Sequence, residues 1–169
     1  MALRKIVKHG NPVLRRKCPP VKLIDKEILQ LIDDMFETMY DAPGIGLAAN
    51  QIGVPLNLTV IDLQADGKKN PIVLINPKIV ELKGRLFEEE GCLSIPGFLA
   101  KTRRYAQAKV EALNEKGFPI TLKGEGLLAR AFQHETDHLN GKLYVDRLSL
   151  LTRLKMHAAI RKYKKTHPW

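Results

Sequence analysis

The chain has 169 residues, of which 44% are hydrophobic and 27% are charged. This length and composition fit one folded domain with a single core, and they exclude a disordered, collagen-like or low-complexity chain. No apolar run approaches the roughly 20 residues that a membrane helix needs, and the first residues lack the apolar stretch of a signal peptide. Two cysteines, Cys18 and Cys92, fit free thiols in a reducing compartment, with a single bridge between them as the alternative. We therefore expect a single cytoplasmic domain over residues 1–169, with no membrane partner.

The formal net charge of +10 is concentrated at the two ends of the chain. All 18 acidic residues fall between Asp25 and Asp146, whereas residues 1–24 hold seven cations and residues 152–169 hold six. Such clusters suit attraction to a polyanion such as RNA, which salt screens strongly. A solvated basic surface is the alternative interpretation of the same charges.

The first half of the chain predicts one helix followed by strands. Asp25 caps a helix that runs to about Tyr40, with apolar residues at helical spacing. Runs of β-forming residues predict strands at 58–63, 72–75 and 79–87, the last one broken at Gly84.

The second half predicts a hairpin and two helices. Residues 109–113 and 118–122 flank Asn-Glu-Lys-Gly and form the hairpin, and the period becomes helical over 124–139. A basic C-terminal helix starts near Ser149 and extends over about 149–169, with fraying expected at 166–169. Its expected apolar residues are Leu150, Leu154, Ala158 and Ile160. Strands grouped between helices predict an α+β fold with mainly antiparallel sheet.

Residues 134–138 read His-Glu-Thr-Asp-His, an H-E-x-x-H motif within the predicted helix 124–139. Histidines four residues apart share one helix face, so both imidazoles reach one metal ion and Glu135 lies beside it. A purely structural role would require two histidines and a carboxylate to be buried in satisfied hydrogen bonds. The motif therefore favours a metal site.

The third protein ligand separates classes of enzyme, because a catalytic site keeps about three protein ligands and one open position. Tyr144 stands where the long metzincin motif has its third histidine, and no glutamate follows Glu135 to complete a thermolysin-like site. Cys92, in a predicted loop at 91–96, offers a thiolate and is the preferred third ligand. The formal alternatives are Asp146, His157 and His167.

Residues 44–51 read Gly-Ile-Gly-Leu-Ala-Ala-Asn-Gln, and the two glycines permit close approach of a substrate backbone. The segment lacks a dinucleotide-binding fingerprint, because Ala49 stands in place of the third glycine. Gln51 offers an amide donor, which fits an ordinary loop hydrogen bond or an oxyanion stabiliser.

Three segments together resemble the signature motifs of peptide deformylase: Gly-Ile-Gly-Leu-Ala-Ala-Asn-Gln, Glu-Gly-Cys-Leu-Ser at 90–94, and Gln-His-Glu-Thr-Asp-His-Leu-Asn-Gly at 133–141. Their order and spacing agree as well, and the resemblance extends over essentially the whole chain. It implies an α+β fold, with antiparallel sheets packed around a central helix that carries the metal motif, plus N-terminal and C-terminal helices. It also implies removal of formyl from the N-terminal formylmethionine of nascent bacterial or organellar polypeptides, with release of formate.

The resemblance further implies a role for each motif residue. It assigns metal ligation to Cys92, His134 and His138, general acid/base work to Glu135, and oxyanion stabilisation to Gln51 and the backbone N–H of Leu93. Family members commonly use Fe²⁺ and accept Ni²⁺, Co²⁺ or Zn²⁺, and a Cys/His₂ donor set is compatible with several of these ions.

For the methionine side chain we expect an apolar pocket formed by Ile45, Leu127 and Ala131. Backbone contacts to the peptide are expected from Gly46 and Gly91. The pocket then depends on the 44–51 segment, the Cys92 loop and the metal-motif helix.

Two further positions differ from some relatives and bear on the pocket rim: Arg130, next to the metal-ligand stripe, and Leu99, in a predicted loop after Pro96. Glu90 and Arg104 are expected to pair and to hold the Cys92 loop.

The basic C-terminal helix has a functional interpretation in this family, because bacterial deformylases work on emerging chains and can dock on ribosomes through it. We expect salt-sensitive ribosome binding and no specific DNA partner. Two rival functions stay open: an H-E-x-x-H metallo-endopeptidase, and a ribosome- or RNA-binding module whose metal is structural.

Overall fold

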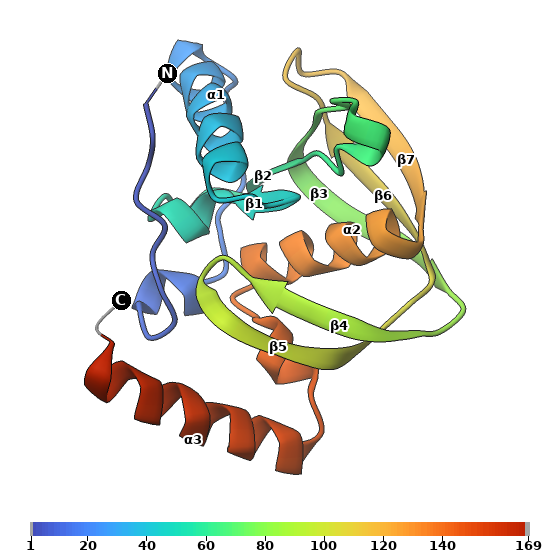
Figure 1. Ribbon diagram of the computed structural model, residues 1–169. Helices are drawn as coiled ribbons and strands as arrows, with labels where there is room; N and C mark the ends of the chain where they lie inside the picture. The colour runs from blue at the N-terminus through green and yellow to red at the C-terminus, as the bar shows by residue number, and fades with distance from the viewer. Residues whose placement is uncertain (1, 168–169) are drawn as a thin grey trace.

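The computed structural model describes residues 2–167. Figure 1 shows α2 in the middle of the molecule, with a large sheet on one side and the β4–β5 pair on the other. No helix within the described range is long and apolar enough to span a membrane. In chain order the elements are η1 Pro12–Arg15, α1 Lys26–Asp41, β1 Gly46–Ala48, η2 Ala49–Ile52, β2 Leu58–Ile61, η3 Ala65–Gly67, β3 Ile72–Lys83, β4 Leu86–Cys92, β5 Ile95–Arg104, β6 Gln107–Leu113, β7 Pro119–Glu125, α2 Gly126–Leu139, η4 Tyr144–Arg147 and α3 Leu150–Thr166.

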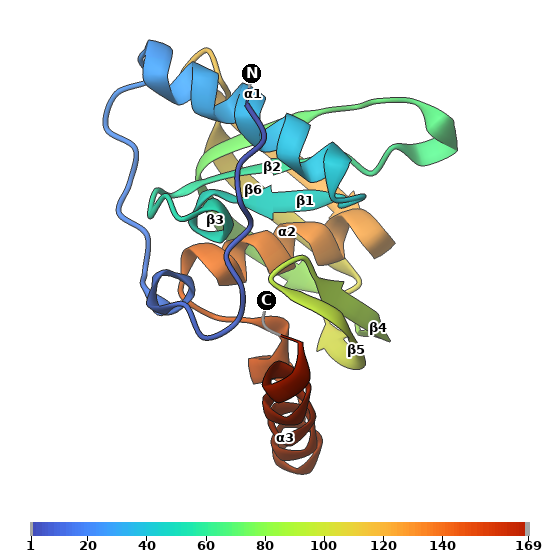
Figure 2. The ribbon, with the colours of Figure 1, turned by 60° about the vertical axis from the view of Figure 1, so that its left-hand side comes forward.

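Two antiparallel sheets carry the fold. Five strands form one sheet in the order β1-β2-β3-β6-β7, and β4 pairs with β5 in the other. The α+β prediction is therefore confirmed, including the central motif helix between antiparallel sheets (Figures 1 and 2).

Both helices that cover the large sheet form where the sequence predicts them. The Asp25 carboxylate accepts a hydrogen bond from the backbone N–H of Ile28 at 3.0 Å and caps α1, which buries Met35 and Met39 against β1 and β2. On the other face of the sheet, α2 buries Phe132 completely. Burial of such a side chain contributes about 1.5–3 kcal/mol and fixes the rotation of the helix.

The C-terminal helix α3 lies below the body of the protein, where η4 leads into it (Figure 2). Ser149 caps it by accepting a hydrogen bond from the N–H of Thr152 at 3.3 Å, and the helix starts where the sequence predicts. Its inner face carries Met156, Ile160 and Tyr163, because residues spaced by three or four share one side of a helix.

The predicted apolar side of this helix is wrong apart from Ile160. Leu150 and Leu154 are 64% and 58% exposed, and Ala158 is exposed too. The error arises because the buried face runs through Met156 and Ile160, and Met156 lies roughly a third of a turn around the helix from Leu150. Part of the expected fraying at 166–169 lies outside the described residues.

One strand, β3, replaces two predicted ones. The strand continues through Asn76 and Pro77, where its pairing with β6 is irregular between Ile75 and Lys78. A bulge tolerates a proline that cannot donate to the ladder. Gly84, at φ +68°, makes the turn into β4.

Two strands were not predicted from the sequence: β1, which is only three residues long, and β5. The predicted loop at 91–96 is wrong, because β4 runs to Cys92 and β5 starts at Ile95, which leaves a two-residue turn. Leu99 consequently lies within β5 and not in a loop.

Candidate metal centre and active site

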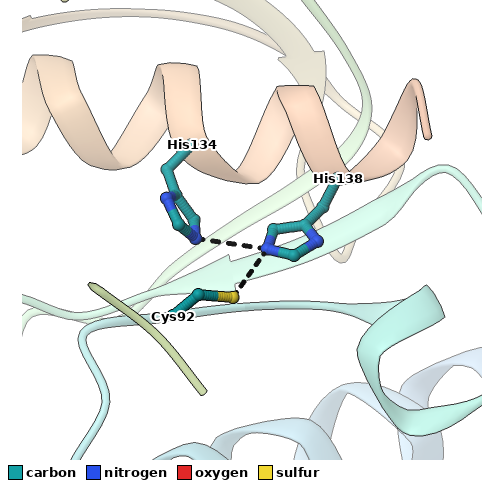
Figure 3. Close-up of side chains that lie close together, drawn as sticks. All are labelled: Cys92, His134 and His138. Atoms are coloured by element: carbon teal, nitrogen blue, oxygen red, sulfur yellow. Dashed lines mark hydrogen bonds between the residues drawn. The ribbon is translucent and has the colours of Figure 1, made fainter. Parts of the chain in front are cut away.

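His134 and His138 leave the same face of α2, and Cys92 reaches them from the end of β4 (Figure 3). The Cys92 Sγ lies 3.2 Å from the Nε2 of His138, which in turn lies 3.2 Å from the Nε2 of His134. All three atoms fall within 4.8 Å of one another. Ligands at about 2.0–2.3 Å from one tetrahedral ion are roughly 3.5 Å apart, so this spacing fits a single divalent metal ion.

The three formal alternatives to Cys92 lie elsewhere. Asp146 forms an ion pair with Arg15, and the ring of His157 lies 5.5 Å from the ring of His9. His167 stands at the C-terminal cap of α3. The structure thus brings the preferred third ligand, Cys92, to the two motif histidines.

A carboxylate orients the first histidine. The Glu90 Oε1 lies 2.6 Å from the Nδ1 of His134, and both Glu90 oxygens accept hydrogen bonds from Arg104, at 2.6 and 3.0 Å. Burial alone raises the pKa of Glu90, but the hydrogen bonds from His134 and Arg104 outweigh it and lower the pKa to about 2. The expected pairing of Glu90 with Arg104 is present, and Arg104 also contacts Asp137 on α2.

The electrostatics of the centre favour a positive charge beside the sulfur. Burial opposes protonation of His134, yet its contacts with Cys92 and Glu90 raise its pKa well above the ordinary value. Burial and the neighbouring His134 lower the pKa of His138. The Cys92 sulfur and the Glu90 carboxylate thus favour positive charge at His134.

Glu135 lies beside these ligands with one oxygen, Oε2, that has no hydrogen-bond partner among the described residues. Only 4% of the residue is exposed, and burial raises the pKa of its carboxyl group to about 7. Gly46 on β1 makes room for it, because a Cβ at that position would lie 2.4 Å from the Glu135 Oε1. A carboxylate with this pKa can take up and release a proton near neutral pH.

Gln51 and Leu93 lie on the other side of Cys92. The Gln51 amide nitrogen donates to the Cys92 Sγ at 3.5 Å and to the Ser94 hydroxyl at 3.2 Å, while its carbonyl oxygen accepts the Ala48 N–H at 2.9 Å. Leu93 occupies the turn between Cys92 and Ser94. Two candidate donors therefore flank the metal ligand, as an oxyanion site requires.

A cavity of about 510 Å³ opens at the centre, lined by the 42–46 loop, the β4–β5 turn and α2. Ile45, Gly46, Gly91 and Ala131 all line it, as expected. Leu127 is not among its lining residues and is 39% exposed, because it lies one turn beyond the end of the cavity in α2.

Arg130 and Leu99 line the rim. The Arg130 guanidinium donates to the Glu89 carbonyl oxygen at 2.8 Å and pairs with Glu88 at 3.2 Å, which ties α2 to β4. A Cβ on Gly91 would lie 2.6 Å from the Leu99 side chain, so this glycine keeps the rim open.

Comparison with known proteins decides the family. A family model described as polypeptide deformylase matches residues 3–154. The chain belongs to the polypeptide deformylase family. It is 52% identical over 149 residues to peptide deformylase 1 of Clostridium acetobutylicum, covering 88% of this chain and 97% of that protein. It is 49% identical over 172 residues to the peptide deformylase of Acidobacterium capsulatum, with both chains covered in full.

Solved structures agree with this assignment. The crystal structure of a peptide deformylase from Legionella pneumophila superimposes with a TM-score of 0.91 at 49% identity, covering 97% of this chain and 96% of that one. A peptide deformylase from Synechococcus elongatus, in complex with actinonin, superimposes with a TM-score of 0.88 at 45% identity, covering 94% of this chain and 86% of that one. The protein is therefore a hydrolase that removes the formyl group from the N-terminal formylmethionine of nascent polypeptides, in a metal-dependent family.

Some residues of this deformylase site carry no sequence signal by themselves. The Asn50 side chain donates to the His138 carbonyl oxygen at 2.6 Å, and its place beside Gln51 in the 44–51 motif was the available hint. The Lys8 ammonium donates to the Leu93 carbonyl oxygen at 2.9 Å, across 85 residues of sequence. Nothing near Lys8 in the sequence points to this contact.

Proposed function

We propose that Cys92, His134 and His138 hold one divalent metal ion, and that Glu135, Gln51 and Leu93 act around it to deformylate the substrate. The single observation that carries this proposal is the convergence of one sulfur and two ring nitrogens beside a buried carboxylate. When bound, the ion lowers the pKa of a water molecule and polarises the formyl carbonyl group.

Fe²⁺ is the ion that we propose, on the resemblance of the three motifs to the family. Ni²⁺, Co²⁺ and Zn²⁺ suit the same donors, because a thiolate with two imidazoles is compatible with several of these ions. The described structure supports the donor set and leaves the choice of ion to metal analysis.

Glu135 moves the protons of the reaction. Its carboxylate takes a proton from the attacking water, and its pKa near 7 suits it to hold that proton. It then passes the proton to the nitrogen of the departing amine, so that the products are formate and a peptide with a free amino group. Its burial keeps bulk water away from the transferred proton.

Gln51 and the backbone N–H of Leu93 stabilise the oxygen that becomes negatively charged. Both groups flank Cys92 and belong to segments that the fold holds in place. Donors that are already oriented stabilise a developing oxyanion without reorganisation, which is the principal gain in acyl-transfer sites.

The methionine side chain binds in the cavity between the 42–46 loop and α2. Ile45 and Ala131 supply its apolar wall, and Gly46 and Gly91 let the peptide backbone approach. Leu127 is left out of this proposal because it lies outside the cavity lining.

A formate-release assay tests the proposal against both rivals. Protein purified without oxygen should contain about one divalent ion per chain, release formate from formyl-Met-Ala and leave casein uncut. Glu135→Gln is the matched control, because it keeps the three ligands and removes the proton carrier. Casein cleavage without formate release would identify an endopeptidase, and bound metal without turnover would indicate a structural centre.

For the basic C-terminal helix the proposed partner is the ribosome, in the cytoplasm where formylated chains are made. α3 carries six cations and no acidic residue, and it lies at the edge of the body (Figures 1 and 2). Leu150, Leu151 and Leu154 are exposed along it. A cationic surface of this kind is attracted to the phosphates of ribosomal RNA.

Charge reversal tests this docking without removing the buried Ile160. A variant with Lys155, Arg161 and Lys162 changed to glutamate should sediment less with ribosomes at low salt while its deformylase rate on a short peptide is retained. The matched control reverses Lys68, Lys116 and Lys123, which are exposed on other parts of the surface. Equal ribosome binding by both variants would contradict the proposal.

A further inference from the structure

An N-terminal strap, residues 7–9, crosses the two segments that supply the proposed oxyanion donors. The Val7 N–H donates to the Gln51 carbonyl oxygen at 2.8 Å, and the His9 N–H donates to the Ser94 carbonyl oxygen at 2.8 Å. Between them, the Lys8 ammonium donates to the Leu93 carbonyl oxygen at 2.9 Å. The strap therefore contacts two consecutive carbonyl groups of the β4–β5 turn.

These contacts hold the peptide group between Leu93 and Ser94 from both sides. The Leu93 carbonyl oxygen accepts from Lys8, and the Ser94 N–H donates to the Cys92 Sγ, 3.4 Å away. The Ser94 hydroxyl also accepts from the Gln51 amide at 3.2 Å. Strap, turn and Gln51 are thus joined in a closed set of hydrogen bonds around the sulfur ligand.

Of the three strap contacts, the one from Lys8 comes from a side chain and can be removed by substitution, since the bonds from Val7 and His9 come from the backbone. Its side chain is half-buried and lines the cavity, and its ammonium group lies at the carbonyl oxygen of the turn. A hydrogen bond from a charged group is stronger than one from a neutral group, so this contact restrains the turn firmly.

We propose that Lys8 is a positioning residue, which holds the Leu93–Ser94 peptide group so that the Leu93 N–H and the Gln51 amide face the reacting carbonyl oxygen. This inference rests on the proposed roles of Gln51 and Leu93. Lys8 acts through the turn and makes no contact with the reacting atoms. Its loss should therefore lower kcat while KM stays the same, because the misplaced donors act mainly in the transition state.

The kinetic test compares Lys8→Met with Lys8→Arg, and uses Lys5→Met as the matched control on an exposed neighbour. Lys8→Met should lose about tenfold in kcat on formyl-Met-Ala, with unchanged KM and full metal content, since a small misplacement of a catalytic group has effects of this order. Lys8→Arg should recover most of the loss, and Lys5→Met should behave as the unmodified protein. A kcat within twofold for Lys8→Met, or a raised KM with unchanged kcat, would overturn the inference.

A second readout is independent of turnover. Amide hydrogen exchange of the segment 90–96 should speed up severalfold in Lys8→Met and not in Lys5→Met, because the turn loses its cationic contact. Unchanged exchange in Lys8→Met would overturn the inference even if activity fell. If the unmodified protein releases no formate, the proposed function fails, and the exchange comparison still decides whether Lys8 holds the turn.

Discussion

The carboxylate of Glu90 lies 2.6 Å from the Nδ1 of His134, and this contact turns the Nε2 of the same ring toward the Nε2 of His138, 3.2 Å away. Arg104 fixes the carboxylate in turn with two hydrogen bonds. A metal-binding histidine is commonly oriented in this way, and the carboxylate makes the ring a better ligand. The affinity of the proposed site for its metal ion should therefore depend on Glu90, although Glu90 is not a proposed ligand.

Replacement of Glu90 by glutamine should weaken metal binding by about 10- to 100-fold, because the ring loses its charged acceptor. Competition with a coloured chelator measures this affinity on folded protein. Glu111→Gln, an exposed change on β6, is the control and should bind metal normally. Equal affinities of the two variants would show that Glu90 does not tune the site.

The amide of Gln51 should matter more for rate than for folding. Gln51→Ala is expected to lower kcat by about 10²–10³-fold through loss of one oxyanion donor. The Ala48 N–H also loses its acceptor, which costs about 1–3 kcal/mol of stability and leaves the protein folded. Steady-state kinetics and circular dichroism check the two effects, and an unchanged kcat would remove Gln51 from the mechanism.

The missing side chain at Gly46 leaves room for the side chain of Glu135. In Gly46→Ala the new Cβ would meet the Glu135 Oε1 at 2.4 Å, so the end of the carboxylate has to move. We expect kcat to fall at least tenfold, because shifts of about 1 Å cost up to ~10² in rate. The melting temperature should fall as well, because the new Cβ would also lie 2.9 Å from the Glu135 Cδ and 3.1 Å from its Cγ, so the whole buried side chain has to shift. Full activity with an intact fold would mean that this carboxylate position is not needed.

His9 links the N-terminal segment to α3 and makes this contact sensitive to pH. Burial, followed by the neighbouring charges of Lys164, His157 and Arg15, lowers the pKa of its ring to about 4, while Asp146 opposes them. An exposed histidine has a pKa of about 6.5, so the unfolded chain takes up the proton more readily. This contribution to stability is complete above about pH 6.5 and is lost as the pH falls toward 4.

His9→Gln should therefore lose less stability between pH 7 and pH 5 than the unmodified protein. Urea unfolding midpoints at the two pH values provide the comparison. His167→Gln, at the exposed end of α3, should keep the original pH dependence. The same pH-dependent loss in all three proteins would show that His9 does not cause it.

Local signals were enough to predict the helices and much of the site. The Asp25 cap, the helix start near Ser149 and the helical period of α2 act within a few residues of sequence, and the structure follows them. The paired histidines of α2 needed only helix geometry to be placed on one face. The proposed third ligand, Cys92, lies 46 residues before His138 and was selected by chemistry and resemblance, because spacing alone carries no information over that distance.

Other features depend on the tertiary fold. The sequence analysis missed β5 because Pro96 and Gly97 are poor strand formers, yet among the described strands β5 pairs with β4 alone and tolerates a proline on its other edge. The pocket role expected for Leu127 followed from the helical stripe, which gives no information on where the cavity ends. The hydrogen bond from Lys8 to Leu93 joins the N-terminal strap to the β4–β5 turn, 85 residues later in the chain.

The order in which the ribosome makes this chain limits when the chain first becomes a catalyst. The strap comes from residues 7–9, the sulfur from position 92 and the rings from positions 134 and 138, so a half-made copy lacks the proposed metal ligands. Because metal capture and folding are coupled, such a copy gains its ion and its activity only after synthesis has passed His138.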